Sequence, residues 1–414
     1  MPRLALAVAS LVAALLVASA APAKEPQLLG LVGAKAPLRL AALDPKTLAP
    51  VGTARVAIGS GGRYGGEACW ATPPWTREQG GSLLAFARND EFTARSLVIV
   101  NPDQLAVTEQ IPLFGAPVGA LAWLAPGRLL AVQEVCCNEI QRLLVVDVAS
   151  GKVLSRRSLG GTVVRVGRTS NALVLLLSPA LRIGTARLAV VAAGGAIRFA
   201  TLRAIDAGTK QLGAGYDVAR QQPGLAVDQA SRRVFVVGRT SVAEVDLRTL
   251  AVSSHVLRQP AVAAKETHGS SRTAGWLGGS MLAISGEDDG PGGVHPAGLR
   301  LVDTRTWSAR DIDSSATGFT VAEGLILATG SSSAPTGLAV YDRTGTLRFR
   351  LFAGMQAWGI VADGAGRAYV GLSTAGGADR PTQIVDLASG RVVGERTTPP
   401  PTLLLGAAGS WWED

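Results

Sequence analysis

Short apolar runs separated by turn residues make up most of the chain, and no long segment repeats its apolar residues with the period of a helix. The pattern is clearest in residues 143–154 and 384–393. Each stretch has an apolar run ending in Asp, a turn ending in Ser-Gly, and a second extended run. Because branched apolar residues on both sides of a turn favour strands, each stretch predicts an antiparallel hairpin.

The same hairpin recurs along the chain, in clear or weaker copies. Its centres are Asp44, Asn101, Asp147, Ala192, Asp246, Asp303, Asp342 and Asp386. Their mean spacing is about 49 residues, close to the length of a four-stranded propeller blade. The repeat therefore predicts an all-β protein, a single closed β-propeller of four-stranded blades. Eight blades are favoured, and seven are the alternative.

Each interval has room for two further strands before the hairpin, for example residues 119–124 and 128–132 before Asp147. With the strands of a blade lettered A to D, the hairpin joins C to D. The chain begins with B-, C- and D-like segments over residues 28–58 and ends with a lone apolar strand at 402–406. This arrangement predicts Velcro closure, in which the C-terminal strand completes the first blade.

The N-terminus has the pattern of a secretory signal peptide. Arg3 precedes an uncharged apolar stretch, residues 4–20, and small residues follow at 18–23. We therefore expect a signal peptide at 1–23, a propeller domain at 24–414, and a secreted or cell-envelope location. No second apolar run is long enough to cross a bilayer, so we expect no transmembrane segment after signal removal, and a monomer.

The formal net charge of +9 raises the question of a nucleic-acid partner. Most of the 40 basic residues are arginines scattered along the chain, with no basic run and no interleaved aromatic residues. That distribution does not indicate a nucleic-acid-binding surface.

The turns at 147–151, 386–390 and, one residue shorter, 342–345 resemble those of the bacterial propeller repeats called YVTN or quinoprotein-like repeats. The resemblance implies a propeller fold, which serves lactonase-like enzymes, quinoprotein dehydrogenases and non-catalytic scaffolds. Quinoprotein alcohol dehydrogenases also have adjacent cysteines, matched here by Cys136-Cys137. Their docking tryptophan is missing after Gly151, Gly345 and Gly390, so their metal and catalytic residues are not carried over.

One candidate site lies in the sixth repeat. In a propeller, the D–A and B–C loops share one face. Our strand assignment places His268 in the D–A loop, and the B–C loop contains Glu287, Asp288, Asp289 and His295. Imidazole and carboxylate groups suit a divalent metal such as Ca²⁺ or an acid–base pair. All five are metal-ligand candidates, and His268, His295 and Asp288 are catalytic candidates. The alternative is a solvated, glycine-rich polar loop.

Tryptophans and cysteines supply further candidates. Trp70, Trp123, Trp276 and Trp358 fall in or beside predicted A strands, where they could stack on a ligand or pack between blades. Oxidation after secretion predicts a disulfide between Cys69 and either Cys136 or Cys137, with one cysteine left over. A vicinal disulfide or a metal thiolate is the alternative.

These observations favour a secreted binding or scaffold protein that recognises a small molecule, a glycan or a protein through its loop-rich face. A metal-assisted hydrolase or lactonase-like enzyme using His268, His295 and Asp288 is the first alternative, and a quinoprotein-like dehydrogenase is the second. The sequence has no nucleophile elbow with a usable histidine and no phosphate-binding loop, so it assigns no enzymatic activity and identifies no cofactor.

Overall fold

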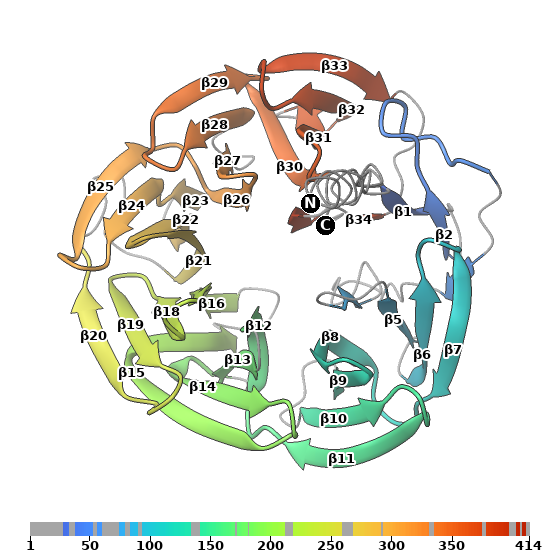
Figure 1. Cartoon of the computed structure of the whole chain (residues 1–414). Coiled ribbons are helices and arrows are strands. Elements are labelled where there is room, and N and C mark those ends of the chain that lie inside the picture. Colours follow the sequence, from blue (N-terminus) through green and yellow to red (C-terminus); the bar gives the residue numbers. More distant parts are fainter. Residues whose placement is uncertain are drawn as a thin grey trace, which may run out of the picture.

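The computed structural model is built from strands arranged around a central axis (Figure 1). It describes residues 28–32, 38–52, 56–59, 74–78, 83–89, 93–133, 141–169, 172–180, 182–211, 218–258, 268–290, 293–330, 335–374, 378–396, 403–405 and 408–410. Within these ranges every regular element is a strand. None of them is a helix long and apolar enough to span a bilayer.

The strands of the described residues form seven hydrogen-bonded sheets, and five of these sheets have four strands. The four-stranded sheets, each read from the inner strand outward, are β34 (Leu403–Leu405), β1 (Leu29–Val32), β2 (Leu38–Ala42) and β3 (Val56–Gly59); β4 (Trp75–Arg77), β5 (Leu84–Asn89), β6 (Ala94–Asn101) and β7 (Ala106–Pro112); β8 (Val118–Ala125), β9 (Arg128–Gln133), β10 (Arg142–Asp147) and β11 (Lys152–Ser158); β17 (Gly224–Asp228), β18 (Arg233–Val237), β19 (Ser241–Asp246) and β20 (Val252–Val256); and β26 (Gly318–Ala322), β27 (Leu325–Thr329), β28 (Leu338–Asp342) and β29 (Leu347–Leu351).

The two remaining sheets are larger. The five-stranded sheet has the order β35 (Ala408–Ser410), β30 (Met355–Ala362), β31 (Arg367–Thr374), β32 (Asp379–Asp386) and β33 (Arg391–Arg396). The ten-stranded sheet contains β12 (Thr162–Arg168), β13 (Ala172–Ser178), β14 (Gly184–Ala192), β15 (Ile197–Gln211), β16 (Val218–Gln222), β21 (Gly269–Gly278), β22 (Met281–Gly290), β23 (Gly293–Pro296), β24 (Leu299–Asp303) and β25 (Ser308–Asp313).

The prediction of eight separate four-stranded blades is therefore wrong, and seven four-stranded blades do not describe the pattern either. The cause is β15, which is 15 residues long. Its first part pairs with β14, and its last residues extend beyond β14 and pair with β16. β16 in turn pairs in parallel with β21, Gln221 opposite Ser270, and so fuses two antiparallel runs into one sheet. β35 adds a fifth strand to another sheet by pairing with β30.

The predicted hairpins are confirmed, because β10 ends at Asp147, β32 ends at Asp386, and each pairs with the following strand. Local side-chain bonds hold the turns. The Ser150 amide donates to Asp147 Oδ1 at 2.9 Å, and the Ser389 amide donates to Asp386 Oδ1 at 2.7 Å. Hydrogen bonds from the Ser150 side chain and backbone lower the pKa of Asp147. The turn ends on a left-handed glycine, Gly390 with φ of 66°.

The turn of one repeat packs on the outer strand of the preceding repeat. A Cβ built on Gly390 would lie 2.7 Å from the Phe349 ring of β29, and one on Gly345 would lie 2.6 Å from Ile312 of β25. Arginines reinforce this contact: Arg198 of β15 donates to the Leu247 carbonyl at 2.7 Å. The glycine of the repeated turn therefore serves contacts between repeats as well as the turn itself.

The first described strand, β1, and the strand β34 near the C-terminus meet in one sheet, while β35 belongs to another. β34 pairs with β1, with Leu403 opposite Leu31 and Leu405 opposite Leu29, as predicted for the C-terminal strand. The Tyr369 hydroxyl donates to the Pro45 carbonyl at 3.1 Å and joins the last repeat to the first. The core lies between neighbouring sheets, and its largest fully buried side chains include Trp123, Tyr369 and Phe235.

Candidate functional site

The inner strands surround the central axis, with β8, β12, β21, β26 and β30 nearest to it (Figure 1). Four of these five strands, all except β26, carry an extra residue against the neighbouring strand. The β12–β13 register shifts between Val163 and Arg165, and the β30–β31 register shifts between Ala357 and Gly359. Bulges of this kind re-aim side chains and are common next to binding sites.

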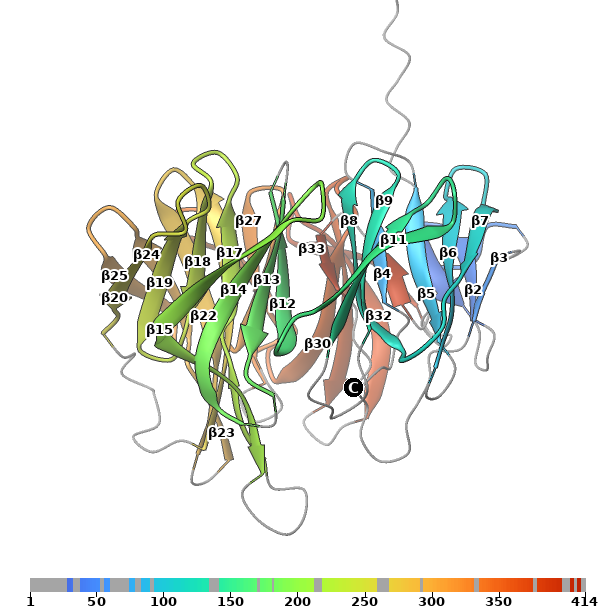
Figure 2. The same ribbon diagram turned by 90° about the horizontal axis from the view of Figure 1, so that it is seen from below.

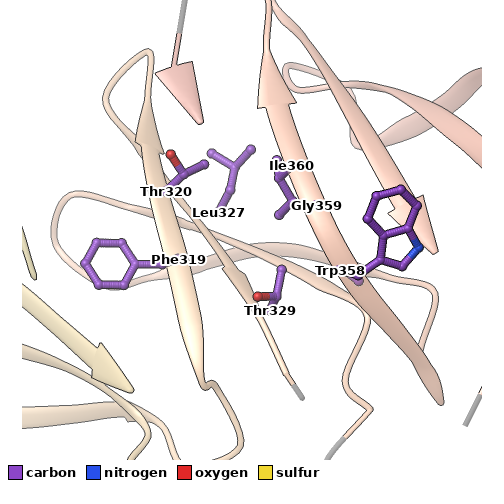
Figure 3. A pocket seen from close by; sticks show the side chains of 8 residues that line it. Phe319, Thr320, Leu327, Thr329, Trp358, Gly359 and Ile360 are labelled. Atoms are coloured by element: carbon purple, nitrogen blue, oxygen red, sulfur yellow. The ribbon is translucent and has the colours of Figure 1, made fainter. Parts of the chain in front are cut away.

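A pocket of about 120 Å³ lies between β26 and β30 (Figure 3). Leu327 and Ile360 meet at its centre, with the side chains of Thr320 and Thr329 beside them. Its full lining is Phe319, Thr320, Leu327, Thr329, Ala357, Trp358, Gly359 and Ile360. The site thus combines apolar side chains with polar surface that includes two hydroxyl groups, which can donate or accept a hydrogen bond.

Local geometry places the two aromatic residues on opposite sides of this pocket. Trp358 is the extra residue of the β30 bulge, and its ring lies over Gly371, where a built Cβ would come within 2.7 Å of the indole. Phe319 lies over Gly275 of β21 in the same way, at 2.9 Å. Figure 3 shows the indole directed away from Phe319. Glycines on the neighbouring strands therefore make room for both rings.

A single cation stands out on the opposite side of the axis. Arg165 of β12 is half-buried, and its one hydrogen bond among the described residues goes from Nη1 to the Val164 carbonyl at 2.9 Å. Burial lowers the pKa of its guanidinium. No carboxylate of the described residues forms an ion pair with it.

The predicted histidine–carboxylate group lies on strands that extend from the ring. Figure 2 shows β22 and β23 projecting beyond the neighbouring sheets. His268 is exposed, and its amide donates to the Asp289 carbonyl at 2.7 Å. His295 of β23 lies opposite Asp288 of β22, and Glu287 lies opposite Pro296.

The side chain of Asp288 is occupied by arginines. Its Oδ1 accepts a hydrogen bond from Arg272 Nη2 at 2.7 Å, and Arg239 Nε lies 3.6 Å from Oδ2. Burial lowers the pKa of Arg272, and Asp288 opposes that change. In the part of the chain that the structure describes, no three His, Cys, Asp or Glu side chains come together in a way that could hold a metal ion. Asp288 is therefore a buried counter-ion here.

The tryptophan candidates have different surroundings. Trp123 is fully buried in the core, and Trp276 stacks on Phe235 with ring centroids 5.1 Å apart. Trp358 is the one that lines the pocket. Trp70, Cys69, Cys136, Cys137 and the expected signal peptide at 1–23 lie outside the described residues.

Sequence reasoning missed Thr320, Thr329 and Arg165. Thr320 and Thr329 are ordinary strand residues, and nothing in the local pattern sets them apart. Arg165 had a weak signal, because it interrupts an apolar run at residues 163–166. A charged residue in such a run is costly unless it is paired or binds something.

Comparison with known proteins supports the fold. No protein-family model matches the chain, and no curated protein matches it by sequence. A solved structure of "Dihydro-heme d1 dehydrogenase NirN in complex with DHE" superposes with a TM-score of 0.59 at 13% identity, over 93% of this chain and 75% of that one. A chain of the mitotic checkpoint complex has a TM-score of 0.42 at 14% identity, over 72% of this chain and 82% of that one, too low to support an argument.

Together, the strand arrangement and the first of these neighbours define the chain as a β-propeller protein. At 13% identity, the likeness concerns the fold alone. The finer resemblance to YVTN or quinoprotein-like repeats stays a prediction.

Proposed function

We propose that this β-propeller is an extracytoplasmic binding protein that takes a small molecule with an apolar ring between β26 and β30. The observation that carries the proposal is the pocket itself, which lies between two inner strands and combines apolar side chains with hydroxyl groups. Its volume of about 120 Å³ is close to that of a cavity that accepts a single benzene-sized ring.

The lining suits a ring that carries a polar substituent. Leu327 and Ile360 supply apolar contact, while Thr320 and Thr329 can bond a hydroxyl, amine or carbonyl group of the ligand. A mostly apolar site with a few placed polar groups is the usual form of a small-molecule site. The N-terminal pattern of residues 1–23 supports the extracytoplasmic location.

The solved structure similar in fold is a dihydro-heme d1 dehydrogenase "in complex with DHE", which makes a tetrapyrrole a ligand class to consider. The histidines of this chain do not favour a histidine-ligated iron at the axis. His255 is on the outer strand β20, His295 is on the projecting β23, and His268 precedes β21. The pocket between β26 and β30 therefore remains the better-supported site.

The binding test uses 4-fluorophenol, a single ring with one hydroxyl group, followed by ¹⁹F transverse relaxation. The Thr320→Phe variant fills the pocket from β26. The Thr273→Phe variant makes the same change on the inner strand β21 and outside the pocket, so it is the matched control.

We expect binding to the unmodified protein and to Thr273→Phe, and a loss of at least about tenfold in affinity for Thr320→Phe, since a filled apolar site loses its contact area. Equal binding by all three proteins would place the ring elsewhere and refute the proposed pocket.

A further inference from the structure

One cation of the inner strands has no counter-ion among the residues that the structure describes. Arg165 lies on β12 and follows directly after the bulged residue Val164. A guanidinium has five N–H donors, and within the described residues Arg165 makes one hydrogen bond, to the carbonyl of its own neighbour. Holding a partly buried cation without a counter-ion is unfavourable, so a structural role does not explain it.

The surroundings of Arg165 on β12 are apolar. Two residues further on, a Cβ built on Gly167 would lie 2.8 Å from Val227 of β17, and it would be 3.0 Å from Leu225. Val164 packs in the same cluster as these residues, while Val166 is 41% exposed and keeps the strand open to solvent. The guanidinium thus lies on an apolar wall that solvent can reach.

Arg272, on the inner strand β21, is an arginine with a clear structural role. It is 3% exposed, it donates to Asp288 Oδ1 at 2.7 Å, and it donates to the Glu287 carbonyl at 2.8 Å. Arg272 is almost fully buried and Arg165 is half-buried, and among the described residues only Arg272 has a carboxylate partner. That Arg165 has no carboxylate partner among the described residues is the observation that points to a ligand.

We propose that Arg165 is an anion-binding residue that takes the carboxylate of an organic monoanion at the axis of the propeller. One guanidinium offers two parallel N–H groups, which match the two oxygens of a carboxylate. Its single charge neutralises a single negative charge. An apolar wall favours a monocarboxylate over a phosphate dianion, because the dianion loses more hydration on entering. This site is separate from the pocket between β26 and β30.

The test compares two ring probes that differ in charge, 4-fluorobenzoate and 4-fluorobenzamide, by ¹⁹F relaxation. The variants are Arg165→Gln and, as a control with the same change of net charge, Arg305→Gln, whose side chain is 79% exposed on an outer hairpin. We expect the unmodified protein to bind the benzoate about tenfold or more tightly than the amide, as hydrogen bonds to charged groups allow.

That ratio should fall to about one in Arg165→Gln and stay unchanged in Arg305→Gln. It should also survive Thr320→Phe, which separates this site from the proposed ring pocket. Equal binding of the two probes to the unmodified protein, or an unchanged affinity ratio in Arg165→Gln, would overturn the proposal. This outcome does not depend on whether 4-fluorophenol binds in the pocket between β26 and β30.

A second measurement separates a binding role from a structural one. Arg165→Met keeps the length of the side chain and removes the charge, so we expect its melting temperature to be equal or higher, because an unpaired cation in an apolar setting is replaced by an apolar group. A clear drop in melting temperature would show that Arg165 supports the fold and would overturn the proposed role.

Discussion

Gly390 is the position where the repeated turn is most open to a test. It has a left-handed φ of 66°, and a Cβ added to it would lie 2.7 Å from two atoms of the Phe349 ring. Gly354 provides a matched control, because its φ of 80° is also left-handed but a Cβ there would meet nothing within 4 Å. The alanine variant at Gly354 measures backbone strain alone, and the one at Gly390 measures strain plus collision.

The magnitudes follow from these two contacts. A left-handed alanine costs about 1–2 kcal/mol, which is the expected loss for Gly354→Ala. Gly390→Ala must also displace Phe349, and overpacking adds about 1–3 kcal/mol. The expected difference between the variants is therefore about 1–3 kcal/mol. Urea unfolding followed by tryptophan fluorescence measures it, provided the dependence on urea is the same for both proteins.

A double variant tests the cause. Phe349→Ala removes the ring that the new methyl group would meet, so Gly390→Ala should cost less in that background, by about the collision part of 1–3 kcal/mol. Equal losses for Gly354→Ala and Gly390→Ala, or a loss at Gly390 that does not depend on Phe349, would refute the view that the turn packs tightly on the preceding repeat.

Two further predictions concern acid stability and the chain ends. Burial raises the pKa of Asp313, but hydrogen bonds from Ser315, from the Tyr341 hydroxyl at 2.6 Å and from Arg350 at 2.6 Å outweigh it and lower the pKa from 3.8 to about 2. The ionised Asp313 therefore stabilises the fold above about pH 4, and this contribution is lost as the pH falls to about 2. In urea titrations, Asp313→Asn should lose less stability over that interval than the unmodified protein. An unchanged pH dependence of the variant would contradict the assignment. A truncation after Leu405 removes β35 and should lower the free energy of unfolding only a little. A truncation that also removes β34 loses the buried Leu404 and Leu405 and should lower it by about 2–5 kcal/mol for each leucine. Equal urea midpoints for the two truncations would refute the role of β34.

The repeated hairpins could be predicted from the sequence because their cause is local. Asp147 and Ser150 are three residues apart, and their hydrogen bond forms within the turn itself. The pairing of β34 with β1 could also be anticipated, since an unpaired apolar strand at one end matched a missing strand at the other. Both inferences need only residues adjacent in sequence or a count of strands.

The fused sheet could not be predicted in this way. β16 pairs with β21 through Gln221 and Ser270, which are 49 residues apart, and no local pattern encodes that contact. The bulge that places Trp358 depends on the register between two strands and not on their composition. The same limit applies to Asp288, since its position among carboxylates and histidines suggested a metal site, while its neighbours in space are Arg272 and Arg239.

The contrast between Arg272 and Arg165 yields the last prediction. Replacing Arg272 with methionine leaves the buried Asp288 with only Arg239 at 3.6 Å among its described ion-pair partners. Breaking a buried ion pair from one side costs about 3–5 kcal/mol, because the remaining charge stays out of water. Arg272→Met should therefore lower the urea midpoint strongly, and Arg165→Met should leave it unchanged or raise it. If both variants were destabilised to a similar degree, Arg165 would have a structural partner, and its assignment as an anion-binding residue would fail. If only Arg272→Met is destabilised, these two arginines have the different roles that the geometry indicates: Arg272 stabilises the fold, and Arg165 is available to bind a ligand.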